Sequence, residues 1–193
     1  MVNNQGGRNA PITPYIMVKV KVPNIIGVSD LESAGKRIFN KIHLILEEDV
    51  DLTKDVEITI TDEARTMAAL PLKAGAEIKE FNFAKHTTGS TSQGSNGDVT
   101  TEVTNSLSGT LAGDRVEIDN FIENYHGVGF YIVTSDRISG KQYIYGRPRC
   151  PYIFTDHDKR KNSDNSSCDV TFTSPFPFQP LEYLGSVQTA EQE

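Results

Sequence analysis

The chain contains no tryptophan and only two cysteines, Cys150 and Cys168, among its 193 residues. A small disulfide-stabilised scaffold contains more cysteines than this, so we expect both thiols to be reduced and mostly buried. The two cysteines are far apart in the sequence and do not form the CxxC pattern that is typical of a zinc site. Nine phenylalanines and seven tyrosines are sufficient to build a hydrophobic core without tryptophan.

Long apolar segments are also missing. The first 14 residues contain no apolar core of a signal peptide, and no apolar run approaches the ~20 residues that a membrane-spanning helix requires. We therefore expect a soluble protein that folds in a cytoplasm and has no membrane partner.

Motifs of common enzyme classes are absent as well: GxGxxG, GxxxxGK[ST], HExxH and GxSxG do not occur. The four histidines are scattered along the chain: His43, His86, His126 and His157. None lies beside a cysteine or serine in a recognisable motif of a catalytic nucleophile. One compact acidic group, 156–158, is followed by three basic residues where a calcium loop needs oxygen ligands and a glycine. The sequence predicts no catalytic, cofactor-binding or metal-binding residue, no cofactor, and a solvated charged turn at 156–167.

Basic residues are the minority among the charged side chains. Nineteen Lys and Arg stand against 26 Asp and Glu, which gives a net charge of −7. Such a chain lacks the basic stripe of a tight nucleic-acid binder, although an acidic wall can line a passage through which nucleic acid slides. Arg147 and Arg149 can pair with phosphate or carboxylate, and we expect an acidic neighbouring subunit as their partner.

What the sequence does contain is a series of short segments with apolar residues at every second position or with short apolar runs. These patterns are typical of strands. They occur at 15–22, 42–46, 56–61, 78–83, 99–107, 130–133, 143–145, 152–154 and 168–173. The sequence therefore predicts a mainly β fold, a β-sandwich or β-barrel of about seven to nine short strands.

One segment has the period of a helix instead. Its apolar stripe follows the spacing i, i+3, i+4, i+7. The stripe consists of Ile118, Phe121, Ile122 and Tyr125. Asp114 and Glu117 have the spacing of a capping box, and Gly127 lies where helices commonly end. We expect an amphipathic helix over 115–125 that packs this stripe on the sheet.

The composition divides the chain into three parts. Residues 1–14 are predicted to be an extended arm, 15–185 a single β-rich domain, and 186–193 a flexible tail. Within the domain, 84–98 is a long segment of small polar residues that is predicted to be a loop. It is either a dispensable flexible loop or a long hairpin arm that orders on a neighbouring subunit, and we expect it to order only in an assembly.

From about residue 97 to 185 the chain resembles the tail tube proteins of tailed bacteriophages, particularly those of phages with Bacteroidetes-like hosts. The residues that carry the resemblance are Gly97, the helix from Asp114 to Tyr125, the hairpin 130–146 and the segment from Val170 to Tyr183. The range 97–185 over which the resemblance extends covers a little under half of the chain. These are patterns of structure rather than of catalytic chemistry.

The resemblance implies a structural virion protein, not an enzyme, located in the phage tail after assembly in the host cytoplasm. Its subunits would form stacked hexameric rings around a channel that conducts DNA without tight binding during genome ejection. The partners would be further copies of the chain and other tail proteins, with 84–98 and 1–14 bridging neighbouring rings. Residues 1–83 match no pattern of that family, so a tail terminator, neck or ring protein remains an alternative. A non-viral β-sandwich binding module and an enzyme whose site is assembled only in space are the others.

Overall fold

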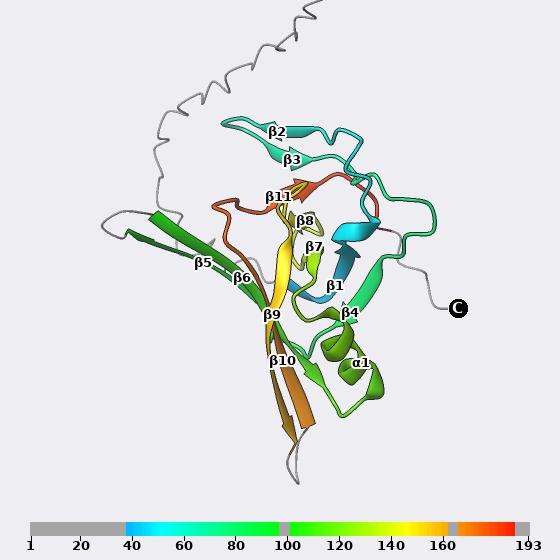
Figure 1. Cartoon of the computed structure of the whole chain (residues 1–193). Helices are drawn as coiled ribbons and strands as arrows, with labels where there is room; N and C mark the ends of the chain where they lie inside the picture. Colours follow the sequence, from blue (N-terminus) through cyan, green and yellow to red (C-terminus); the bar gives the residue numbers. More distant parts are fainter. Residues whose placement is uncertain (1–37, 97–100, 162–165, 188–193) are drawn as a thin grey trace, which may run out of the picture. The chain divides into compact units, whose positions relative to one another are not determined.

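The computed structural model describes residues 38–96, 101–161 and 166–187 (Figure 1). The predicted arm 1–14 and the predicted strand 15–22 lie outside these residues, as do Gly97 and 188–193. The described residues belong to one compact unit. They form eleven strands in a single mixed sheet, one α-helix and one 3-10 helix, Glu47–Asp49. The predicted mainly β, broadly sandwich-like fold with one helix is therefore confirmed, with more strands than expected.

The strands follow one another across the sheet in an order that differs from the sequence. That order is β2 (Ile58–Ile60), β3 (Arg65–Met67), β11 (Leu181–Tyr183), β8 (Gln142–Tyr145), β7 (Gly129–Asp136), β9 (Tyr152–Lys161), β10 (Ser166–Ser174), β6 (Thr101–Ala112) and β5 (Gly89–Asn96). A further strand, β1 (Ile38–Leu46), pairs with β7 and with β4 (Lys79–Asn82). Every pairing is antiparallel except that of β11 with β3.

Two hydrophobic clusters hold the sheet together, and β1 contributes to both because successive side chains of a strand point to opposite faces. Ile42 and Leu44 belong to the first cluster, and Ile45 belongs to the second. The first also contains Leu107, Phe130, Phe154, Val170 and Phe172, and the second Met67, Tyr131, Val133, Ile144 and Leu181. Val187 is only 8% exposed and packs in the second cluster, so the predicted flexible tail does not begin at 186.

The helix α1 (Val116–Tyr125) covers the first cluster, as its apolar stripe predicted. Ile118 and Phe121 are buried, while Ile122 and Tyr125 are partly buried against the same cluster. The predicted capping box is wrong. Arg115 occupies the N-cap position without a side-chain hydrogen bond. Asp114 is instead engaged by two lysines of β9, which offer its carboxylate stronger partners than the helix amides.

The polar segment 84–98 is not a loop throughout, because residues 89–96 form β5. Every residue of β5 is paired with β6, from Gly89 opposite Ser108 to Asn96 opposite Thr101. The expectation of a loop was wrong here because a strand needs backbone partners rather than apolar side chains, and β6 supplies them within the same chain. The paired strands have the form of a hairpin. The expectation that this segment orders only in an assembly is wrong for 89–96, because β5 is ordered on β6 of the same chain.

Two further boundaries were misplaced. The predicted charged turn is largely strand, since β9 continues to Lys161 and β10 begins at Ser166. The strand predicted over 99–107 continues as β6 to Ala112. Gly109 has a packing role, because a Cβ atom at this position would lie 2.6 Å from the Phe83 ring. Only glycine leaves room for that ring.

Candidate functional site: a polar sheet face with two open edges

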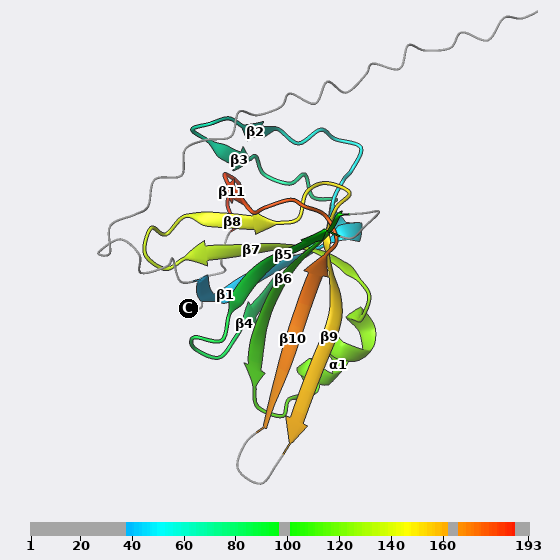
Figure 2. The ribbon, with the colours of Figure 1, turned by 90° about the vertical axis from the view of Figure 1, so that its left-hand side faces the viewer.

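Two long hairpins, β5–β6 and β9–β10, lie side by side and form a four-stranded sheet in the order β5, β6, β10, β9 (Figure 2). All three pairings within it are antiparallel. It follows that β5 and β9, at the two sides of this sheet, run in opposite directions.

One face of the four-stranded sheet is almost entirely polar. The pairing registers place side chains from all four strands on this face: Thr91, Gln93, Ser95, Glu102, Thr104, Ser106, Ser108, Thr110, Asp156, Asp158, Arg160, Asp169, Thr171 and Thr173. We call this set the polar face. The opposite face carries core residues such as Leu107, Val170 and Phe172. The alternation of the strands therefore separates a hydrophobic inner surface from a hydroxyl-rich outer surface.

Side-chain hydrogen bonds connect neighbouring strands across the polar face. Thr91 Oγ1 and Ser106 Oγ lie 2.6 Å apart, which joins β5 to β6. Thr110 Oγ1 donates to Asp169 Oδ1 at 2.6 Å, which joins β6 to β10. Cross-strand pairs of this kind stabilise a sheet by about 0.2–1 kcal/mol each. They also give these hydroxyl groups partners on the neighbouring strands.

The charge of the polar face is predominantly negative. Four carboxylates lie on it, those of Glu102, Asp156, Asp158 and Asp169, and Arg160 is its one basic residue. The Arg160 guanidinium is itself occupied, since Nε donates to Asp158 Oδ2 at 2.9 Å and Nη2 lies 3.9 Å from Asp169 Oδ2. The face therefore offers no free cation to a phosphate group.

Both sides of this four-stranded sheet have unpaired edges. β5 pairs only with β6, and β9 beyond Ile153 pairs only with β10, as far as the described strands are concerned. Monomeric proteins commonly protect such edges with lysine, proline or bulges. β5 contains none of these residue types and no charge in its sequence GSTSQGSN. Among the described strands, the outer edge of β5 is therefore both unpaired and without these protective features.

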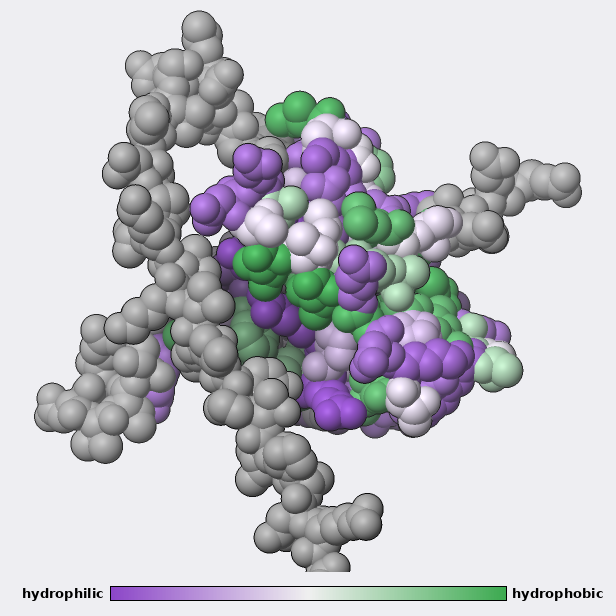
Figure 3. Space-filling model, turned by 90° about the horizontal axis from the view of Figure 1, so that it is seen from above, coloured by the Kyte–Doolittle hydropathy of each residue, from purple (hydrophilic) through white to green (hydrophobic). Residues whose placement is uncertain are grey.

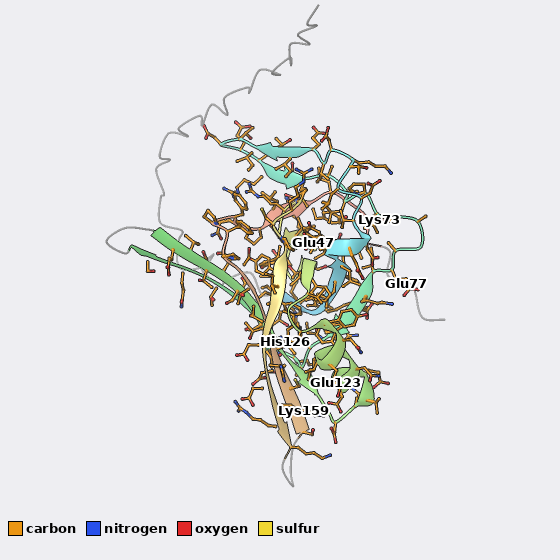
Figure 4. The ribbon with its side chains drawn as sticks, viewed as in Figure 1. Glu47, Lys73, Glu77, Glu123, His126 and Lys159 are labelled. Carbon is orange, nitrogen blue, oxygen red and sulfur yellow. The ribbon has the colours of Figure 1, made fainter. Side chains whose placement is uncertain are left out.

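Ion pairs between β9 and the start of α1 brace the far half of the β9–β10 hairpin. Lys159 Nζ lies 2.9 Å from Asp114 Oδ1 and 2.5 Å from Asp119 Oδ1, and Lys161 Nζ also contacts Asp114. Figure 4 shows Lys159 on the hairpin beside the helix. Hydrogen bonds from Lys161 and Lys159 lower the pKa of Asp114 to about 2. The hairpin is thus held by ion pairs from β9 to the start of α1 and by the pairing of β10 with β6.

The histidines do not converge on one centre. His43 is buried in β1, where burial lowers its pKa, and His86 is exposed in the turn before β5. His126 and His157 are brought together, with ring centroids 5.7 Å apart, which sequence spacing did not indicate. Within the described ranges, no group of three His, Cys, Asp or Glu side chains could hold a metal ion. The absence of catalytic and metal-binding residues stays a prediction.

The cysteines and the two arginines beside Pro148 have ordinary surroundings. Cys168 is buried and Cys150 partly buried, both as free thiols, and burial raises the pKa of each. The guanidinium carbon of Arg147 lies 4.2 Å from the centroid of the Phe178 ring, a cation–π contact within the chain. Pairing of either arginine with an acidic neighbouring subunit stays a prediction.

Hydrophobic residues on the view from above are dispersed. Figure 3 shows them in several separate groups among hydrophilic residues. The most exposed large apolar side chains of the described residues come from different parts of the chain: Val116, Ile138 and Leu184.

No helix among the described residues combines the length and the apolar character needed to cross a bilayer. Comparison of the chain with protein-family models, with curated proteins and with solved structures finds no match. The geometry of the chain itself must therefore support any functional conclusion.

Proposed function

We propose that this chain is a structural subunit that assembles with copies of itself into rings, and that these rings form the tail tube of a tailed bacteriophage. The observation that carries the proposal is the four-stranded sheet β5–β6–β10–β9. It has a polar face, and among the described strands the outer edges of β5 and of β9 beyond Ile153 are unpaired. In this proposal the protein acts by assembly and is not an enzyme.

The directions of the strands support a ring. Because β5 and β9 run in opposite directions, β5 of one copy can pair with β9 of the next in the same antiparallel manner as the strands within each copy. This contact joins two different surfaces, so repetition adds subunits head to tail and closes a ring when the rotation permits. The number of six subunits rests on the resemblance of residues 97–185 to tail tube proteins.

The polar face supports a channel lining. In such a ring the joined sheets would present one continuous surface of hydroxyl groups and carboxylates toward the centre. Carboxylates repel phosphate groups, and Arg160 is already paired with Asp158, so DNA would pass without tight binding. Other tail proteins would be the axial partners. A tail terminator or neck ring would use the same edges, and its position at one end of the tail would distinguish it from a tube subunit.

Cross-linking between copies tests the proposed edge contact. We would combine Gln93→Cys on β5 with Asp158→Cys on β9, replace Cys150 by serine, and treat the concentrated protein with a short bismaleimide. Cys168 is fully buried and stays in place. A head-to-tail contact should give a ladder of dimers, trimers and larger species in denaturing gels, and electron micrographs should show rings or tubes.

Single-cysteine variants are the matched controls, because each can form at most a dimer. Tube proteins that need a nucleus stay monomeric when dilute, so the decisive measurement is made at high concentration after prolonged incubation. A strict monomer in light scattering under those conditions, with no ladder in the double variant, would refute the proposal and favour a monomeric binding module.

A further inference from the structure

A cavity of about 540 Å³ lies where three segments meet: the start of β1, the turn between β4 and β5, and the turn between β7 and β8. Its volume falls within the ~300–1,000 Å³ that is typical of small-molecule sites. The cavity is separate from the polar face, since none of the residues of that face lines it. It therefore calls for an explanation of its own.

The charge of this cavity is opposite to that of the protein. Lys85, His86 and Arg137 line it, and its described lining contains no Asp or Glu. None of these three side chains forms an ion pair with a carboxylate of a described residue. In a chain with a net charge of −7, a cavity whose described titratable lining residues are all basic concentrates positive potential and attracts an anion.

The turn that carries Lys85 and His86 is held in place by hydrogen bonds to β6. The Ala84 amide donates to the Thr110 carbonyl at 2.7 Å, and the Thr110 amide donates to Thr87 Oγ1 at 3.1 Å. Thr87 Oγ1 in turn donates to the Ala84 carbonyl at 2.8 Å. His86 has a φ of 66°, a left-handed conformation that costs energy in a residue other than glycine. These bonds keep His86 in that conformation and fix the position of the backbone from which the Lys85 and His86 side chains extend.

The turn that carries Arg137 is equally constrained. Asp136 Oδ1 accepts a hydrogen bond from the Ile138 amide at 2.9 Å, and Oδ2 accepts one from Ser139 Oγ at 2.8 Å. The carboxylate nearest to Arg137 in sequence is thus used to shape the turn, and it does not line the cavity. Because the two turns are already fixed, binding of a common ligand orders only the basic side chains and not the backbone, which favours affinity.

The rest of the lining is suited to an organic ligand. Ile38 and Phe39 give the cavity an apolar wall, and Phe39 is 40% exposed although it is aromatic. Thr88 also lines the cavity, and its hydroxyl is buried without a hydrogen-bond partner in the described structure. A buried hydroxyl without a partner is destabilising, and an oxyanion would supply the missing acceptor.

We propose that this cavity binds a small organic anion. Lys85 and Arg137, together with His86 and the Thr88 hydroxyl, hold its phosphate or carboxylate group, and its apolar part lies against Ile38 and Phe39. This inference does not rest on assembly, because every residue of the site belongs to one copy of the chain.

Titration calorimetry on the full chain tests the proposal with three probes: phenyl phosphate, benzoate and inorganic phosphate. Phenyl phosphate and benzoate together distinguish a phosphate ligand from a carboxylate ligand, and inorganic phosphate isolates the contribution of the ring. We expect saturable binding of at least one aromatic anion with one site per chain, and weaker binding of inorganic phosphate.

The double variant Lys85→Gln/Arg137→Gln should weaken binding of the aromatic anion by about tenfold or more, since each lost charge-assisted hydrogen bond is worth that much. The matched control is Lys54→Gln/Arg149→Gln, which removes the same charge from exposed positions outside the cavity and should bind as the parent does. Phe39→Ala should reduce the preference for phenyl phosphate over inorganic phosphate.

Circular dichroism would confirm that each variant keeps its fold, and Phe39→Ala tests the site independently if the charge variant does not. Failure of both aromatic anions to bind would overturn the proposal, as would equal losses in the cavity variant and in its control. Inorganic phosphate that binds as tightly as phenyl phosphate would overturn the assignment of Phe39 to the site.

Discussion

Replacing Phe121 by alanine should remove the main contact between α1 and the sheet. Phe121 is 8% exposed and lies at the centre of an aromatic cluster. Its ring centroid is 4.6 Å from that of Phe81 on β4, 5.0 Å from Phe154 on β9 and 6.0 Å from Phe130 on β7. One side chain thus joins the helix to three strands that are far apart in sequence.

The expected loss follows from the cavity that the substitution leaves. Deletion of a buried phenylalanine ring costs about 3–5 kcal/mol, because the surrounding side chains relax only partly. The rings around Phe121 belong to strands in a fixed register, so we expect little collapse and a loss within that range. Since domains of this size are stable by about 5–15 kcal/mol, the variant should unfold at a much lower denaturant concentration.

Urea unfolding followed by circular dichroism measures this loss. The matched control is Val116→Ala on the same helix, where the side chain is 70% exposed and the change should stay within about 0.5 kcal/mol. A loss below ~1 kcal/mol for Phe121→Ala, or equal losses for the two variants, would show that the helix stripe faces solvent. The packing of α1 on the first hydrophobic cluster would then be wrong.

Two further predictions concern β6 and the helix start. Gly109→Ala should destabilise the fold because the new methyl group would lie 2.6 Å from the Phe83 ring. Gly94→Ala is the control and should not destabilise it, because the atoms nearest to its new methyl group are 4.0 Å away. Equal melting temperatures for the two variants would contradict this prediction. The lysine partners of Asp114 lower its pKa from 3.8 to about 2, so the stability that they provide is present above pH 3.8 and is lost as the pH falls through about 2. We expect Asp114→Asn to lower the melting temperature near neutral pH. Its difference from the parent should shrink as the pH falls from 3.8 to about 2, and a difference that persists unchanged in acid would count against these ion pairs.

Elements that depend on neighbouring residues in the sequence were predictable from the sequence. The stripe of α1 was correct because contacts at i+3 and i+4 are local, and Gly127, with a φ of 83°, follows the helix as expected. The prediction of a hairpin at 130–146, which β7 and β8 form, was confirmed for the same reason. Its turn is short, and Gly140 adopts a φ of 69° that glycine accepts readily.

The candidate site was much less predictable. The acidic composition indicated a wall that repels phosphate, but it did not indicate that four carboxylates share one face. That arrangement depends on the registers of β9 with β10 and of β10 with β6, which join residues as far apart in the sequence as Asn105 and Ser174. The basic cavity was missed in the same way, because Phe39, Lys85 and Arg137 meet only through the pairing of β1 with β7 and the turn before β5.

What the sequence by itself determined is the mainly β class, the position of the helix and the alternation of the apolar strands, all of which follow from periods of two or of about 3.6 residues. The tertiary structure alone decided that GSTSQGSN forms a strand and that β9 continues through Asp156 to Lys161. Neither segment has an apolar face that identifies it. β5 exists because β6 supplies its hydrogen bonds, and the end of β9 exists because β10 pairs with it and carboxylates near α1 neutralise its lysines.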